Sequence, residues 1–383
     1  MATHRNKAIA IIGGGIGGIA AALALHRIGV DVLVYERAEQ LREIGAGMML
    51  WPNATRVLKE MGVLEDVVQR GGHNTNFLVR SSRGRILMNI ALGQFEVPAV
   101  CIRRSDLLSI LLSALPAKCL KLGYEFEHLK QIGRKVRIYF RNGCVEEHDA
   151  AVGADGIRSR VKSELFGASD PIYRGYVVWR GLAQYDGSAI AAGFNSESWG
   201  KGMRFGILST GHQRFTWYAT ANISSPYVHG AWEQKRELKQ LFAGWHEPVA
   251  DFLEATEESE ILKNGARDCR PLRQWGKGMV TLLGDAAHPC TPNLGQGGCM
   301  ALEDALVLAK NINREPSLQI ALRSYESLRI HRTRHIQQRS LLMGCIGQWR
   351  SPLFVTGRKV ITQMLPVRLI ERNLRRVYSY AAA

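Results

Sequence analysis

The stretch from Ala8 to Glu36, AIAIIGGGIGGIAAALALHRIGVDVLVYE, decides the fold of this chain. It contains a short apolar run, a loop with five glycines, an apolar run rich in alanine and leucine, and a second short apolar run. This pattern predicts a strand over 8–12, a tight loop, a helix that ends near Gly29, and a strand over 30–36. Together these elements are the first half of a dinucleotide-binding βαβ unit.

The glycine loop and the acidic residue after it indicate how a dinucleotide would bind. Glycines permit a tight turn and close approach of a pyrophosphate, and the helix that follows presents its positive end. The glycines concerned are Gly13, Gly15, Gly17 and Gly18. Glu36 ends the second strand and can accept hydrogen bonds from ribose hydroxyls, and the neighbouring Arg37 is expected to approach the adenosine. Either FAD or NAD fits this pattern.

Further along the chain the hydrophobic periodicity changes twice. Residues 171–222 are rich in Trp, Tyr and Phe in alternating patterns, which predicts an antiparallel sheet. Before and after this region, helical spacing returns together with short apolar strands. Helices are expected over 53–62, 104–114, 231–262 and 299–310, and strands over 135–140, 147–153 and 279–283.

These elements predict an α/β fold with two domains and a tail. The nucleotide-binding domain is discontinuous and consists of residues 1–70, 100–170 and 265–340. The antiparallel β-sheet substrate domain consists of residues 71–99 and 171–264, and a basic helical segment over 341–383 follows.

Composition excludes several classes of function. Lys and Arg outnumber Asp and Glu by 50 to 34, which gives a formal net charge of +16. No nucleic-acid-binding motif accompanies this charge, so anionic cofactors and substrates explain it better than nucleic acid. The seven cysteines contain no Cys-x-x-Cys pair, which argues against a disulfide framework or a zinc site. Glycines interrupt the longest apolar stretch, so no transmembrane helix is expected and a cytoplasmic location is the default.

A metal centre and an acyl-transfer site are not expected either. His331 and His335 are four residues apart, but they lie in a strongly basic segment that disfavours a cation. The chain has no Gly-x-Ser-x-Gly motif for a nucleophilic serine.

Two further motifs favour FAD over NAD. Residues 152–161 read VGADGIRSRV, and residues 280–304 read VTLLGDAAHPCTPNLGQGGCMALED. With the glycine fingerprint before them, these Asp-Gly and Gly-Asp motifs follow the order of the class A flavoprotein monooxygenases. From Ala8 to about Arg332 the chain therefore resembles this p-hydroxybenzoate hydroxylase-like family. The resemblance implies a Rossmann-like, GR2-type FAD-binding domain.

The same resemblance implies particular cofactor contacts. Asp285 would accept hydrogen bonds from the flavin ribityl hydroxyls. The loop before the helix over 299–310 would direct backbone amides at the flavin ring; its residues are Gly295, Gln296, Gly297 and Gly298. Further implied contacts are Arg104 with the flavin and pyrophosphate, the backbone near Phe126 with the adenine, and Asp155 with Arg158 in FAD and nicotinamide binding. The adjacent Arg103 is expected to be structural.

The implied activity is insertion of one oxygen atom, through a flavin C4a-hydroperoxide, into a small aromatic or heteroaromatic substrate. NADH or NADPH would reduce the flavin, and dioxygen would be the second substrate. The chain contains no second glycine fingerprint for a nicotinamide domain, as this family implies. Two other activities stay open: epoxidation or hydroxylation of an isoprenoid or quinone, and flavin reduction without oxygen transfer. A binding scaffold related to GDP-dissociation inhibitors is a non-enzyme alternative.

Within the family, the chain is most similar to urate hydroxylases, salicylate-hydroxylase-like enzymes and zeaxanthin-epoxidase-like proteins. The segments YRGYVVWRGL and KGMRFGIL are part of this likeness. Urate hydroxylases have Asn, Tyr and Asp at three positions where this chain has Val178 or Arg180, Thr216 and Asn293. Arg204 is retained and is the candidate for holding an anionic substrate, and a structural ion pair is its alternative role.

The basic segment from Arg350 to the end mixes Lys and Arg with large apolar residues. Two interpretations follow from this mixture. It can form an amphipathic surface that contacts an anionic membrane, or a helix that packs over the FAD-binding domain.

Overall fold

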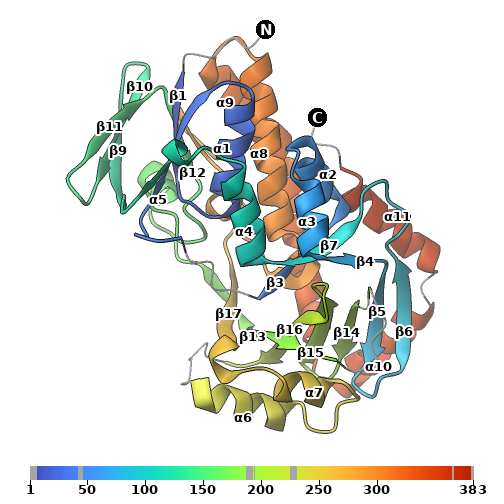
Figure 1. The fold of residues 1–383 in the computed structure, drawn as a ribbon. Coiled ribbons are helices and arrows are strands. Elements are labelled where there is room, and N and C mark those ends of the chain that lie inside the picture. Colours follow the sequence, from blue (N-terminus) through green and yellow to red (C-terminus); the bar gives the residue numbers. More distant parts are fainter. Residues whose placement is uncertain are drawn as a thin grey trace.

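A computed structural model of the chain describes residues 7–41, 46–186, 193, 195–224, 231–364 and 366–380. Its helices surround a parallel sheet in the upper part of Figure 1, and a large mostly antiparallel sheet lies below. A small sheet lies between the two, with strands β3 (Gly47–Leu50), β7 (Ala99–Arg103) and β4 (Gly72–Asn74). The predicted combination of a Rossmann-like part and a second sheet is confirmed.

The nucleotide-binding part is built on five parallel strands. Their order is β18 (Val280–Leu282), β12 (Ala150–Gly153), β1 (Ala8–Ile12), β2 (Asp31–Glu36) and β8 (Leu120–Leu122). Helix α1 (Ile16–Arg27) packs against α8 (Gly297–Arg314), and the fully buried alanines of α1 allow this close approach. Because the strands run in one direction, the residues that follow β1, β12 and β18 meet at one edge.

The strand predicted over 147–153 is two strands in the structure. β11 (Val145–His148) pairs with β10 (Lys135–Phe140) in a small antiparallel sheet that β9 (Phe126–Ile132) completes. The chain then enters the parallel sheet at β12. The change occurs at Asp149, whose amide donates to Ala8 O at 2.8 Å and whose carboxylate accepts from Ala8 N at 2.9 Å. This ties the junction to the start of β1.

The second sheet has seven strands, and two of them come from early in the chain. Their order is β17 (Leu262–Asp268), β13 (Ile172–Gln184), β16 (Arg214–Asn222), β15 (Met203–Ser209), β14 (Asn195–Trp199), β5 (Asn76–Ser81) and β6 (Ile86–Ala91). All neighbours are antiparallel except β14 and β5, which are parallel. One face packs through Trp179, Phe205 and Trp217 against α6 (Ala231–Leu241) and α7 (Val249–Glu254). The other face looks toward the nucleotide-binding part (Figure 1).

The remaining helices connect these layers. They are α2 (Pro52–Glu60), α3 (Leu64–Arg70), α4 (Arg104–Ser113), α5 (Arg160–Phe166), α9 (Leu318–Gly347), α10 (Pro352–Met364) and α11 (Val367–Tyr378). The predicted helices over 53–62, 104–114 and 299–310 correspond to α2, α4 and α8. The region over 231–262 contains α6 and α7, and its last residue begins β17.

The C-terminal segment packs against the body at one end and is exposed at the other. Tyr378 stacks on Trp51 with ring centroids 4.5 Å apart, and the Arg332 guanidinium lies 3.8 Å from the centre of the Tyr380 ring. In contrast, α10 exposes several large apolar side chains, which include Leu353 and Met364, each 77% exposed. Among the described helices, none is both long and apolar enough to cross a membrane.

Candidate active site

The glycine loop after β1 has the shape that a pyrophosphate requires. Gly13 has φ +114°, and a Cβ there would lie 2.5 Å from the carbonyl oxygen of Ala154. A Cβ at Gly18 would overlap the carbonyl oxygen of Gly13. Gly15 differs, because no atom lies within 4 Å of where its Cβ would be. Two glycines are therefore needed for packing, and the third leaves open space in front of the amides at the start of α1, which no side chain caps.

Glu36 is held rigidly beside this loop. Its Oε2 accepts from the amide of Gly14 at 2.7 Å, and its Oε1 accepts from the amide of Ala38 at 3.0 Å. A carboxylate oxygen can accept more than one hydrogen bond, so the half-buried side chain retains capacity for ribose hydroxyls. Arg37 is exposed next to it.

Asp285 lies in a short 3-10 turn, Gly284–Ala286, directly after β18. Its carboxylate accepts no hydrogen bond from the part of the chain that the structure describes. Although Asp285 is exposed at this edge, desolvation by the protein around it raises its pKa, and the nearby His288 and Arg104 oppose that rise. Hydroxyl donors would stabilise the charged form of this carboxylate, because each hydrogen bond to a carboxylate oxygen favours ionisation. The residue thus fits a polyhydroxyl chain such as the flavin ribityl group.

The second glycine loop brings the start of α8 to the same edge. Gly295 has φ +60°, and no side chain caps the helix after Gln296. The Oδ1 of Asp285 lies 3.9 Å from where a Cβ of Gly297 would be. The amides at this helix start therefore lie next to Asp285, where they can face an electron-rich ring edge.

A buried charge network holds α8 in place, and no sequence motif predicted it. Asp304 accepts from Arg329 Nε at 2.6 Å, from His288 Nε2 at 2.5 Å and from the amide of Gly284 at 3.0 Å. Although burial opposes its ionisation, His288 and Arg329 hold the pKa of Asp304 at about 2. Glu303 pairs with Arg329 at 2.7 Å and accepts from Asn53 Nδ2 at 2.7 Å. Asn53 Nδ2 also donates to Gln296 Oε1 at 3.0 Å, which joins this network to the glycine loop.

The remaining predicted cofactor residues lie around this edge with different surroundings. Asp155 caps α5: its carboxylate accepts from Ser159 Oγ at 2.5 Å and from the amide of Arg160 at 2.7 Å. The carbonyl of the buried Phe126 accepts from Arg160 Nη1 at 3.2 Å. Arg158 is exposed near the start of α5.

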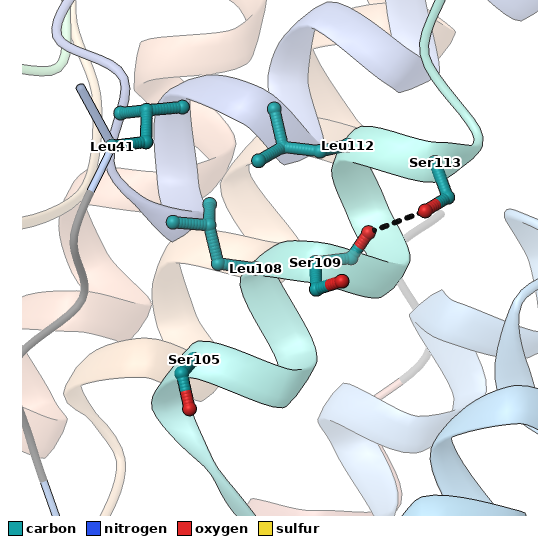
Figure 2. Close-up of a pocket in the computed structure, with 6 residues that line it drawn as sticks. All are labelled: Leu41, Ser105, Leu108, Ser109, Leu112 and Ser113. Carbon is teal, nitrogen blue, oxygen red and sulfur yellow. Dashed lines mark hydrogen bonds between the residues drawn. The ribbon is translucent and has the colours of Figure 1, made fainter. Parts of the chain in front are cut away.

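The two arginines at the start of α4 have different surroundings. Arg103 forms an ion pair with Asp106 at 3.1 Å, which agrees with the structural role predicted for it. Arg104 is exposed, and its charge influences Asp285 across the edge. A cavity of about 460 Å³ lies beside α4. Figure 2 shows the leucines and serines that line it, and none of these side chains is charged.

Arg204 lies on the face of the seven-stranded sheet that looks toward this edge, and it is 3% exposed. Its guanidinium pairs with Glu197 at 3.3 Å and donates to Asn293 Oδ1 at 2.6 Å and Gln348 Oε1 at 3.3 Å. Tyr218 also donates to Glu197. The structure thus supplies a partner for the ion-pair alternative, and a direct contact between Arg204 and substrate stays a prediction.

The positions that differ from urate hydroxylases surround this network. Asn293 hydrogen-bonds with the Tyr176 hydroxyl, at 3.2 Å through its Oδ1. Thr216 accepts from the amide of Gly47 at 3.0 Å. A second cavity, of about 370 Å³, opens beside Tyr176 and Asn293 and is bounded on its other side by Leu341 and Cys345 of α9.

Comparisons with known proteins agree with this geometry. A family described as "FAD binding domain" matches residues 6–340. The aurachin C monooxygenase/isomerase of Stigmatella aurantiaca is 34% identical over 372 residues, which cover 96% of this chain and 97% of that protein. The 6-hydroxynicotinate 3-monooxygenase of Bordetella bronchiseptica is 33% identical over 86% of this chain and 89% of that protein.

A solved structure gives the same result for the fold. Klebsiella pneumoniae HpxO complexed with FAD and uric acid superposes with a TM-score of 0.92, 25% sequence identity, and coverage of 97% of each chain. FAD as the cofactor, NAD(P)H as the electron donor and the monooxygenase class are thereby confirmed. The chain belongs to the FAD binding domain family and is a class A flavin monooxygenase.

Proposed function

We propose that this enzyme inserts one oxygen atom from dioxygen into a small aromatic or heteroaromatic ring. The observation that supports this most directly is the meeting of two surfaces. The cofactor edge, with Gly15, Asp285 and the loop before α8, lies opposite a sheet face that contains Tyr176, Arg204 and Tyr218. A ring held between them would lie against the flavin. Relatives that act on hydroxynicotinate and aurachin C support the substrate class.

Each part of the cofactor edge has a proposed role. The amides at the start of α1 bind the pyrophosphate, Glu36 holds a ribose, and Asp285 accepts hydrogen bonds from the ribityl chain. The amides at the start of α8 stabilise negative charge on the flavin ring. Arg37, Arg104, Phe126 and Asp155 complete the set from around the edge. Bound FAD supplies the redox chemistry with NAD(P)H and dioxygen.

The chain itself positions the substrate and excludes water. Tyr176, Asn293 and Arg204 are tied to one another by hydrogen bonds, so this wall needs little reorganisation when substrate arrives. Apolar residues such as Val178 lie on the same face and limit solvent access. Excluding water protects the reactive oxygen from hydrolysis before transfer.

Substrate-stimulated oxidation of NAD(P)H tests the proposal. Purified protein with FAD is screened with aromatic acids, hydroxypyridines, purines and quinolones, and ¹⁸O₂ labelling follows the product mass. Incorporation of one labelled oxygen atom into a ring is expected. Epoxidation of an isoprenoid side chain would give the same mass gain but an NMR spectrum with an unchanged ring, and it would contradict the proposed site of attack. NAD(P)H oxidation without any labelled product would show that the protein is a flavin reductase that transfers no oxygen.

We also propose that the enzyme is cytoplasmic and that it contacts an anionic membrane through α10. The exposed face of α10 contains Leu353, Phe354, Ile361 and Met364. Lys359 of the same helix and Arg350 before it are exposed as well. Apolar side chains mixed with cations favour the surface of an anionic bilayer, because each contact adds burial or charge attraction.

A further inference from the structure

Arg180 lies in the middle of β13, on the face of the sheet that looks toward the cofactor edge. Its neighbour Trp179 is fully buried on the opposite face, in the core under α6 and α7. Since side chains alternate along a strand, Arg180 shares its face with Tyr176 and Val178. Its direct cross-strand neighbour on β16 is Tyr218.

Two hydrogen bonds fix the distance between this face and the cofactor edge. Near one end of β13, Tyr176 bonds to Asn293, and near the other, Gly47 donates to Thr216. The loop that starts at Asn293 continues to Gly298, which packs against Met48 beside Gly47. The glycine loop of α8 therefore spans the interval between these two attachments, and Arg180 lies within that interval on the opposite side.

The two arginines on this face differ in whether a described residue pairs with them. Arg204 has Glu197 as its partner, and Tyr218 also donates to Glu197. Arg180 is partly buried, yet it forms no hydrogen bond or ion pair with the residues that the structure describes. The charged group that acts on it is Arg104, another cation, and the phenol of Tyr176 is close as well. Burial and Arg104 together lower the pKa of Arg180 to about 10.

A half-buried guanidinium next to a second cation is unfavourable unless an anion arrives. The planar group offers parallel N–H donors, a geometry that suits a carboxylate or a ring-bound oxyanion. We propose that Arg180 is the residue that binds the substrate, and that the substrate class is an aromatic ring with a carboxylate or an ionised hydroxyl. This inference rests on the proposed function and gives its substrate a charge.

The position also explains how such a substrate would react. A hydroxyl group on the ring ionises more readily beside a guanidinium, because the cation stabilises the oxyanion. The ionised ring is a better nucleophile toward an electrophilic oxygen. The proton of that hydroxyl passes to solvent water as the anion binds, and Arg180 holds the resulting oxyanion without exchanging a proton itself.

The test measures anion binding through the visible spectrum of bound FAD, with 6-hydroxynicotinate, salicylate and azide as probes. Benzamide, which has neither a carboxylate nor a ring hydroxyl, is the neutral counterpart. We expect Arg180→Gln to weaken binding of the anions at least about tenfold, since a hydrogen bond to a charged group is lost, while benzamide and FAD affinities stay unchanged. Arg180→Lys is expected to be intermediate, because it keeps the charge but not the paired donors. Arg137→Gln, which removes a surface arginine paired with Glu147, is the matched control.

Other outcomes overturn the inference. Equal anion affinity in wild type and Arg180→Gln would show that Arg180 does not bind substrate. A loss of FAD affinity with unchanged anion affinity would assign the residue to the cofactor. If no anion perturbs the wild-type spectrum, the substrate is not held by charge and the inference fails. Absence of labelled oxygen in any product would instead refute the proposed function, whatever the anion affinities.

Discussion

At the scale of single residues, Asp285 is the side chain on which cofactor retention should depend most directly. It accepts no hydrogen bond from the described residues and lies next to the start of α8. Asp285→Ala should therefore weaken FAD binding at least about tenfold, because charge-assisted hydrogen bonds to the cofactor are lost. Folding should be nearly unaffected. Flavin content after gel filtration and urea unfolding of the apoprotein measure the two effects.

The control for this experiment is Asp251→Ala, which removes an aspartate from α7 whose carboxylate accepts from Tyr185 at 3.2 Å. It should leave FAD affinity unchanged. Equal flavin content in Asp285→Ala and wild type would remove Asp285 from the cofactor site.

The two predicted roles of Arg204, substrate binding and a structural ion pair, can be separated by mutation. Arg204→Ala leaves Glu197 buried without its cation, so the free energy of unfolding should fall by roughly 3–5 kcal/mol. Urea unfolding of the FAD-bound protein measures this loss, and Arg204→Met with Glu197→Gln should recover part of it. Unchanged stability together with a raised KM for an anionic substrate would instead show that Arg204 binds substrate.

At the scale of elements, the helix starts and the strand ends determine the site. α1 and α8 each begin at a glycine-rich loop without a side-chain cap, so their amides stay available for a ligand. The network of Asp304, Arg329 and His288 fixes where α8 begins. The network thus ties Asp304 of α8 to Arg329 of α9 and to His288 after β18, so the position of this helix start depends on parts of the chain that are distant in sequence.

The exposed face of α10 gives a prediction about lipid. Vesicles that contain phosphatidylserine should carry the protein in a flotation gradient at low salt, and binding should weaken as salt screens the charges. A variant with Leu353→Ser, Phe354→Ser and Ile361→Ser should float less. The matched control is Ile132→Ser with Val145→Ser, which replaces two exposed apolar residues in the sheet of β9, β10 and β11. No flotation at low salt would refute the lipid contact, and a dimer that the α10 variant dissociates would show that a second copy covers this face.

At the scale of the whole molecule, acid should destabilise the protein partly through Asp304. Its folded pKa of about 2 lies below the ordinary 3.8, so its contribution to stability is fully present above the unfolded pKa and is lost as pH falls from about 4 toward 2. The difference corresponds to about 2 kcal/mol. Urea unfolding between pH 5 and 2 should show this decline.

The variant Asp304→Asn isolates the contribution of Asp304. Its free energy of unfolding should depend less on pH over this window than that of the wild type. The variant should also be less stable at pH 7, because Arg329 and His288 lose a buried partner. A variant as steeply acid-sensitive as wild type would show that other carboxylates dominate. Raised pKa values at Asp155 and Glu326 act in the opposite direction, since their destabilising effect disappears as they become protonated.

The arrangement of the cofactor edge could be predicted from local sequence patterns. The glycine loop over 13–18, Glu36 and the Gly-Asp motif at Asp285 follow strands that run in parallel, so a local pattern already implied that they would meet at one edge. The boundary at Asp149 was missed, because an apolar run does not reveal that its two halves pair with different strands.

Which arginine of the substrate sheet has an ion-pair partner became clear only from the three-dimensional structure. Arg180 and Arg204 look alike in the sequence, since each lies on a strand among apolar neighbours. Folding places Glu197 against Arg204, whereas Arg180 is left among the described residues with another cation, Arg104, acting on it. The physical reason is that ion pairing depends on contacts between strands far apart in the chain, and no periodicity along one strand records which partner the neighbouring strand supplies.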